Sequence, residues 1–112
     1  EEESTVDRLS AGITNYAIKL SSLQISEKEH QSVAHLLQIV SDMERISDYC
    51  ENISEFAETL YEKKVSFSEI GKEQIKEMLD VCTDSYRYAL DSLVEQSKEK
   101  AFRVIEKETQ AA

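Results

Sequence analysis

Proline is absent from the 112-residue chain, and Gly12 and Gly71 are the only glycines. Since these two residues interrupt helices and form most tight turns, their scarcity favours long uninterrupted helices. The chain also has almost no alternation of β-branched and polar residues, which excludes a sheet as the main architecture. The sequence therefore predicts an all-α protein.

Long apolar runs are missing as well. No stretch approaches the roughly eighteen apolar residues that span a bilayer, and no basic segment followed by an apolar one opens the chain. We therefore expect no direct membrane insertion by these residues. The length is that of one domain or a fragment of one, with a modest core.

Cysteines number only two, Cys50 and Cys82, which is too few for a disulfide framework or a CxxC zinc site. Both fall on apolar helix faces, so the sequence predicts buried thiols in a reducing compartment. A cytoplasmic location is the expectation that follows.

Basic residues are outnumbered, with 13 Lys and Arg against 23 Asp and Glu, for a net charge of −10. An acidic surface repels phosphate backbones and anionic lipid, so we expect no nucleic-acid partner. Cations or basic partners are favoured instead. The alternative is that the acids only keep a helical surface soluble.

Apolar residues at helical spacing are abundant and define two long helices. The first is predicted to end near residues 21–24, and the second to cover 27–63 from a capping box of Ser26 and Glu29. The first stripe consists of Val6, Leu9, Ile13, Tyr16, Leu20 and Leu23. The second consists of Leu36, Ile39, Met43, Ile46, Cys50, Ile53, Ala57 and Leu60.

A third helix is predicted from a capping box of Ser66 and Glu69 to about residue 96. Its stripe consists of Ile75, Leu79, Cys82, Tyr86, Ala89 and Leu93. Because short connections make neighbouring helices antiparallel, residues 1–96 are predicted to form an up-down three-helix bundle. Residues 97–112, with Ser97 as N-cap, are expected to be the truncated start of a fourth helix that opens a next repeat.

Pairs of acids four residues apart occur nine times, so this spacing alone says little about function. Glu44 and Asp48 lie about 160° around the second helix from its apolar stripe, which predicts that they face outward. By the same calculation, Glu3 and Asp7 lie at the outer side of the first helix. Carboxylates from two adjacent helices provide oxygen ligands for Fe, Mn, Zn or Mg, and the alternative is a solvated acidic face.

Signatures of enzymes are scarce. A di-iron carboxylate bundle needs two Glu-x-x-His pairs, and Glu27 with His30 is the only one. No nucleophile elbow or glycine-rich phosphate loop is visible. We therefore expect no enzymatic activity, with a carboxylate-metal hydrolase or oxidase as the weaker alternative.

The segment MERISDYCENI, from Met43 to Ile53, resembles the E-R-I-G-D-x-x-x-N-I signature of the PhoU-domain family of phosphate-uptake regulators. Residues 3–9, ESTVDRL, resemble the E-x-x-x-D-x-L of the same family's first helix. Residues 101–108 are similar to the opening of its next repeat. Ser47 replaces the usual glycine, and Ala112 stands where the second repeat would place its next acid.

The resemblance implies repeats of three antiparallel helices whose E-x-x-x-D pairs bind multinuclear iron or zinc clusters. Carried over by position, it implicates Glu3, Asp7, Glu44 and Asp48 as metal ligands. The chain is most similar to the PhoU-like C-terminal domain of bacterial sodium/phosphate cotransporters. That similarity implies a non-enzymatic regulatory domain at the cytoplasmic face of the membrane, partnered by a transporter membrane domain or other phosphate-uptake machinery. The alternatives are a free PhoU-type regulator and a purely structural dimerisation or interaction module.

Self-association is the remaining expectation. The apolar residues of the fourth helix, Phe102 to Ile105, lack the cover that a complete second repeat would give them. We therefore expect a homodimer, and exchange of this last helix is one form that it can take.

Overall fold

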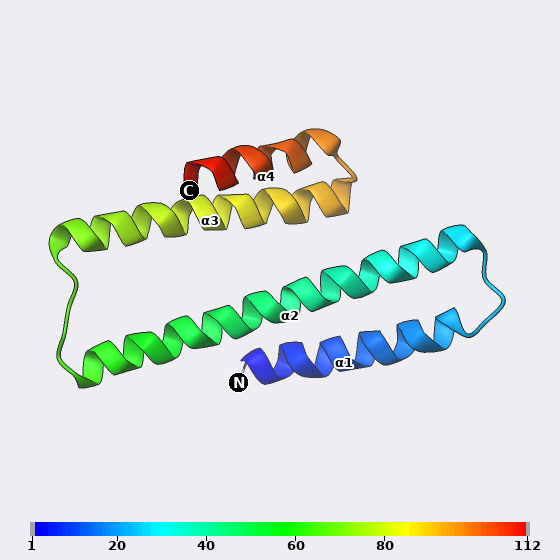
Figure 1. Cartoon of the computed structure of the whole chain (residues 1–112), viewed down its shortest axis with the longest axis horizontal. Helices are drawn as coiled ribbons and strands as arrows, with labels where there is room; N and C mark the ends of the chain where they lie inside the picture. Colours follow the sequence, from blue (N-terminus) through cyan, green and yellow to red (C-terminus); the bar gives the residue numbers. More distant parts are fainter. Residues whose placement is uncertain (1, 112) are drawn as a thin grey trace. The chain divides into compact units, whose positions relative to one another are not determined.

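The computed structural model describes residues 2–111, which form four α-helices and no strand (Figure 1). The helices are α1 (Glu2–Ser21), α2 (Glu27–Glu62), α3 (Glu69–Glu95) and α4 (Lys98–Ala111). They divide into two compact units, Glu1–Val65 with α1 and α2, and Ser66–Ala112 with α3 and α4. Within the described residues no helix is both long and apolar enough to cross a membrane. The predicted all-α class is confirmed.

Capping chemistry sets the start of two helices where the sequence predicts it. At α2 the Ser26 hydroxyl accepts a hydrogen bond from the Glu29 backbone N–H at 3.3 Å, and the Glu29 carboxylate accepts one from the Ser26 N–H at 2.7 Å. At α4 the Ser97 hydroxyl accepts from the Lys100 N–H at 3.4 Å. The capping box of Ser26 and the N-cap at Ser97 are therefore confirmed.

The start of α3 differs from the prediction. Ser68 is the N-cap, and its hydroxyl accepts a hydrogen bond from the Gly71 N–H at 3.1 Å. Gly71 occupies the third helical position. No carboxylate at that position can therefore accept a hydrogen bond from the backbone N–H of the N-cap. Ser66 lies in the irregular segment that follows Lys64, whose φ of 52° is left-handed. The predicted capping box of Ser66 and Glu69 is therefore wrong.

The first unit is an antiparallel pair in which α1 packs along α2 (Figure 1). Ala17 and Val40 are its buried apolar residues, and Ser10 is its buried polar residue. The positions of α1 and α2 that cover one another, here called the α1–α2 seam, recur every three or four residues. They include Glu3, Ser10, Thr14 and Ala17 of α1, and Val33, Leu37, Val40, Glu44 and Ser47 of α2. Small side chains dominate the α1 side, so the two helices approach closely.

The apolar stripes predicted from the sequence lie beside this seam rather than in it. Tyr16 and Ile46 each precede a seam residue by one position, a rotation of about 100°, and they are 66% and 42% exposed. Because α1 and α2 are antiparallel, the same rotation places both stripes on one side of the pair. We call this side the apolar face of the first unit. Its exposed members include Leu9, Ile13 and Tyr16 of α1 and Leu36, Met43, Ile46 and Ile53 of α2.

Both cysteines are exposed, which contradicts the prediction of buried thiols. Cys50 belongs to the stripe of α2 that α1 does not cover. Cys82 likewise lies on a face of α3 that α4 does not cover.

Three charged contacts link α3 and α4 in the second unit. Lys100 of α4 lies 2.7 Å from Oε1 of Glu95 and 3.5 Å from Oδ2 of Asp91. Further along α4, Lys107 lies 3.6 Å from Oδ2 of Asp84. The hydrogen bond to Glu95 raises the pKa of Lys100, because it stabilises the charged ammonium.

Candidate metal centre

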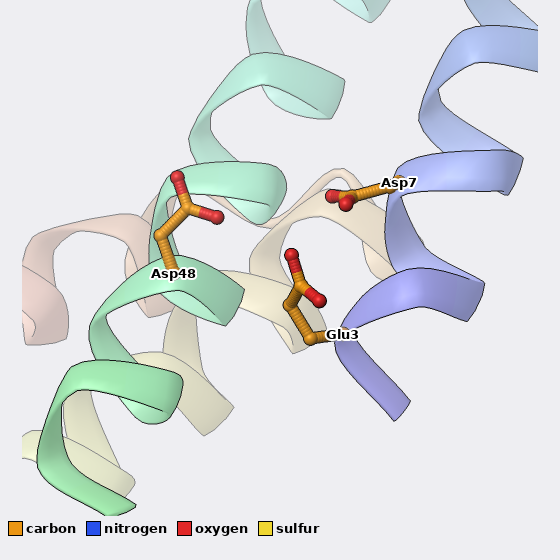
Figure 2. Close-up of side chains that lie close together, drawn as sticks. All are labelled: Glu3, Asp7 and Asp48. Atoms are coloured by element: carbon orange, nitrogen blue, oxygen red, sulfur yellow. The ribbon is translucent and has the colours of Figure 1, made fainter. Parts of the chain in front are cut away.

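Three of the four carboxylates predicted as ligands come together across the α1–α2 seam. Glu3 and Asp7 lie on successive turns at the start of α1, and Asp48 lies on α2 (Figure 2). One carboxylate oxygen from each residue lies within 4.8 Å of the other two. The three side chains point toward one another from the two helices. We call Glu3, Asp7 and Asp48 the carboxylate cluster.

The fourth predicted ligand, Glu44, is not among the carboxylates whose oxygens lie within 4.8 Å of one another. It is half-buried one helical turn before Asp48, and its Oε2 accepts a hydrogen bond from the Ser10 hydroxyl at 3.2 Å. The prediction that Glu44 faces away from the packed helices is wrong, because α1 covers the face of α2 that carries it. Asp48 is exposed, as predicted.

Neighbouring acids perturb Glu3, a half-buried member of the cluster. The pKa of Glu3 is raised, first by a hydrogen bond with Asp7 and then by the negative charges of Asp7 and Glu51. Partial burial and the charge of Asp48 add smaller effects of the same sign. These neighbours therefore make it harder for Glu3 to carry a charge, and a bound cation would remove that penalty.

Sequence reasoning missed two residues beside the cluster, Glu51 and Ser10. Glu51 comes three positions after Asp48, so the two share a helix face, and its charge acts on Glu3. Ser10 comes three positions after Asp7 on the seam side of α1. Positions 3, 10, 14 and 17 of α1 recur at helical spacing and would have identified Ser10 as a seam residue. The more apolar stripe beside them was instead taken to mark the packed face.

The donor set fits a metal ion. Carboxylate oxygens suit hard and borderline cations such as Mg, Mn, Fe and Zn. With metal–oxygen distances of about 2.0–2.2 Å, two oxygens on one ion stand at most about 4.4 Å apart. The three oxygens of the cluster already lie within 4.8 Å of one another, close to this limit. Three carboxylates from two helices supply the charge and the oxygen atoms for one cation.

Comparison with known protein families gives a match. A family model described as the PhoU domain matches residues 1–57, just over half of the chain, and these residues include all four predicted ligands. No curated protein and no solved structure matches the chain significantly. The similarity of residues 101–108 to a second repeat stays a prediction.

Proposed function

This chain belongs to the PhoU domain family, and we propose that it is a regulatory, non-catalytic domain of a phosphate uptake system that binds a metal ion. Glu3, Asp7 and Asp48 hold the ion, and Glu44 is the fourth ligand. The observation that carries the proposal is the meeting of three carboxylates from α1 and α2 within 4.8 Å, inside the matched residues. Iron or zinc is the expected metal.

A bound cation has a clear physical consequence in this unit. The positive charge of the cation compensates the negative charges of the carboxylate cluster. The cation also links the start of α1 to the middle of α2. The packing of the two helices then depends on whether the metal is present. Such a dependence is what a regulatory domain needs in order to pass a signal to a partner.

Metal content tests this proposal directly. The chain is purified, dialysed against Zn²⁺ or Fe²⁺, and measured by elemental analysis alongside a Glu44→Ala/Asp48→Ala double variant. A Glu58→Ala/Glu62→Ala variant removes an equally spaced acid pair of α2 and serves as the control. We expect the parent and the control to hold stoichiometric metal and the first double variant to lose it. Equal metal in all three proteins would show that the ligand assignment is wrong.

The cellular setting is a finer part of the proposal. We propose that the chain is the PhoU-like domain of a sodium-dependent phosphate cotransporter, at the cytoplasmic face and in contact with the membrane domain. The support is the similarity of residues 43–53 to that group of relatives. Membrane helices in the same reading frame would support this setting. A reading frame that encodes only PhoU repeats would indicate a free regulator instead.

We also propose that the first three helices form the predicted up-down bundle. The support is the exposed apolar face of the first unit and the matching apolar stripe of α3, which needs cover of its own. In the sequence Cys50 and Cys82 lie at matching distances from the connection between α2 and α3. An oxidant that forms disulfides should therefore link them within one chain in high yield. A chain that never forms this bond would contradict the bundle.

A purely structural module is the second candidate function, and the exposed apolar side chains favour it. Phe102 and Ile105 of α4 are 66% and 58% exposed, and we propose that they contact a second copy of the chain. Sedimentation should then show a dimer that Phe102→Glu weakens, and a monomer at high concentration would count against it. A melting temperature that is indifferent to Zn²⁺, Mn²⁺, Fe²⁺ and EDTA would favour the structural module over the metal-binding regulator.

A further inference from the structure

We infer that Ser10 is a positioning residue for the metal centre, which acts by holding Glu44 in place as the fourth ligand. This inference rests on the proposed function. Among the residues whose side chains the structure describes, Ser10 is the one polar residue that is buried, with 8% of its surface exposed. A buried hydroxyl needs a partner, and the partner here is a carboxylate that belongs to the predicted ligand set.

Ser10 and Glu44 form the layer of the α1–α2 seam that adjoins the carboxylate cluster. On α1, Ser10 lies one turn beyond Asp7, and on α2, Glu44 lies one turn before Asp48. Because the two helices are antiparallel, both steps lead in the same direction along the seam. The hydrogen bond of 3.2 Å between Ser10 and Glu44 therefore joins the helices directly beside the three carboxylates.

The hydroxyl controls which oxygen of Glu44 is free. It donates a hydrogen bond to Oε2, which satisfies one oxygen of a half-buried carboxylate and leaves Oε1 without this bond. Without the hydroxyl the glutamate side chain regains its rotamers, and it must be ordered again when the metal binds. Hydrogen bonds of this kind to ligating carboxylates typically change metal affinity by about 10- to 100-fold.

Zn²⁺ titrations of the full 112-residue chain test the inference. The proteins are the parent, Ser10→Ala, Glu44→Gln, the Ser10→Ala/Glu44→Gln double variant, and Thr14→Ala, which removes a hydroxyl from the same seam one turn further along α1. We expect Ser10→Ala to weaken Zn²⁺ binding about 10-fold or more. Thr14→Ala should stay within about twofold of the parent, as expected for a hydroxyl outside the site.

The double variant separates a positioning role from a structural one. If Ser10 acts through Glu44, Ser10→Ala should have no further effect once Glu44→Gln is present. The absorption spectrum of bound Co²⁺ should also differ between the parent and Ser10→Ala, because the ligand arrangement changes. Ser10→Thr keeps the hydroxyl and should restore the parent affinity for Zn²⁺. If Ser10→Ala does not fold, the Zn²⁺ affinity of Ser10→Thr tests whether the hydroxyl is what the site requires.

Several outcomes would overturn the inference. An affinity for Ser10→Ala equal to that of the parent would show that the hydroxyl does not matter, and a tighter one would show that it competes with the metal. An equal loss in the Glu44→Gln background would show that Ser10 acts elsewhere. In all three cases the parent still binds Zn²⁺ and the proposed function stands. A parent that binds no Zn²⁺, Fe²⁺ or Mn²⁺ refutes the proposed function, and this inference with it.

Discussion

Glu3 and Asp7 bring their carboxyl groups together one turn apart on α1, with one oxygen of each within 4.8 Å of the other, and the proximity of Asp7 raises the pKa of Glu3 above its ordinary value. Asp48 approaches the same pair from α2. The start of α1 is therefore held against α2 in spite of repulsion among its acids. The seam residues beyond, with Ala17 and Val40 buried among them, provide the packing that offsets this cost.

Removing one charge from the cluster should stabilise the metal-free protein. In the presence of EDTA at pH 7, we expect Asp48→Asn to raise the melting temperature by roughly 1–3 °C, because like charges on neighbouring turns cost a few tenths of a kcal/mol. Asp42→Asn, which changes an acid of α2 outside the cluster, should leave it nearly unchanged. Differential scanning calorimetry of the three proteins measures this, and a lower melting temperature for Asp48→Asn would contradict the account.

The capping box at the start of α2 should show a pH signature. Hydrogen bonds from the backbone and hydroxyl of Ser26 hold the pKa of Glu29 below its ordinary value of 4.5. The stabilisation is therefore present above pH 4.5 and is lost as the pH falls through the lower pKa of the folded state. We expect Ser26→Ala to return the pKa of Glu29 toward 4.5 and to cost about 1 kcal/mol at neutral pH. An NMR titration of the Glu29 side chain with and without the substitution tests the first expectation, and urea unfolding tests the second.

Close approach of α1 and α2 depends on Ala17, which is 1% exposed. Ala17→Leu should force the helices apart and cost about 1–3 kcal/mol, as overpacking of a filled interior usually does. Ala11→Leu adds the same atoms at an exposed position of α1 and should change the free energy of unfolding by less than about 0.5 kcal/mol. Chemical unfolding of both variants measures the contrast. Equal effects would mean that the seam is not packed as described.

Ion pairs join α4 to α3, so the attachment of α4 should depend in part on Lys100. We expect Lys100→Met to increase hydrogen exchange at the backbone amides of α4, because the contacts with Asp91 and Glu95 are lost. Lys98→Met removes an exposed lysine of the same helix and is the control. High salt should reproduce part of the effect in the parent. Unchanged exchange in Lys100→Met would show that these ion pairs do not hold the helix.

The sequence predicted the helices well because their signals are local. Scarce proline, apolar residues at helical spacing and the Ser26 cap located α1 and α2 to within a residue or two. The start of α3 was misplaced because Ser66 and Ser68 both offer a capping hydroxyl. The choice between them depends on the backbone path after Lys64, which no side-chain pattern records.

The candidate site was predictable only in part. The motif resemblance selected Glu3, Asp7 and Asp48, and the structure brings these three together. The predicted orientation of Glu44 was wrong because the apolar stripe was taken to mark the one face of α2 that packs against neighbouring helices. α1 instead packs on the adjacent seam, where small residues such as Ser10 and Ala17 allow close approach. Which of two adjacent faces a helix pair uses depends on shape, and hydrophobicity alone does not decide it.

Calorimetric titration of Zn²⁺ into the parent, Asp48→Asn and Asp42→Asn tests the central claim most directly. If the carboxylate cluster is the metal centre, the parent and Asp42→Asn bind Zn²⁺ with the same affinity and stoichiometry, and Asp48→Asn loses binding. Indistinguishable titrations of all three proteins would contradict the claim, and so would the absence of any heat of binding in the parent.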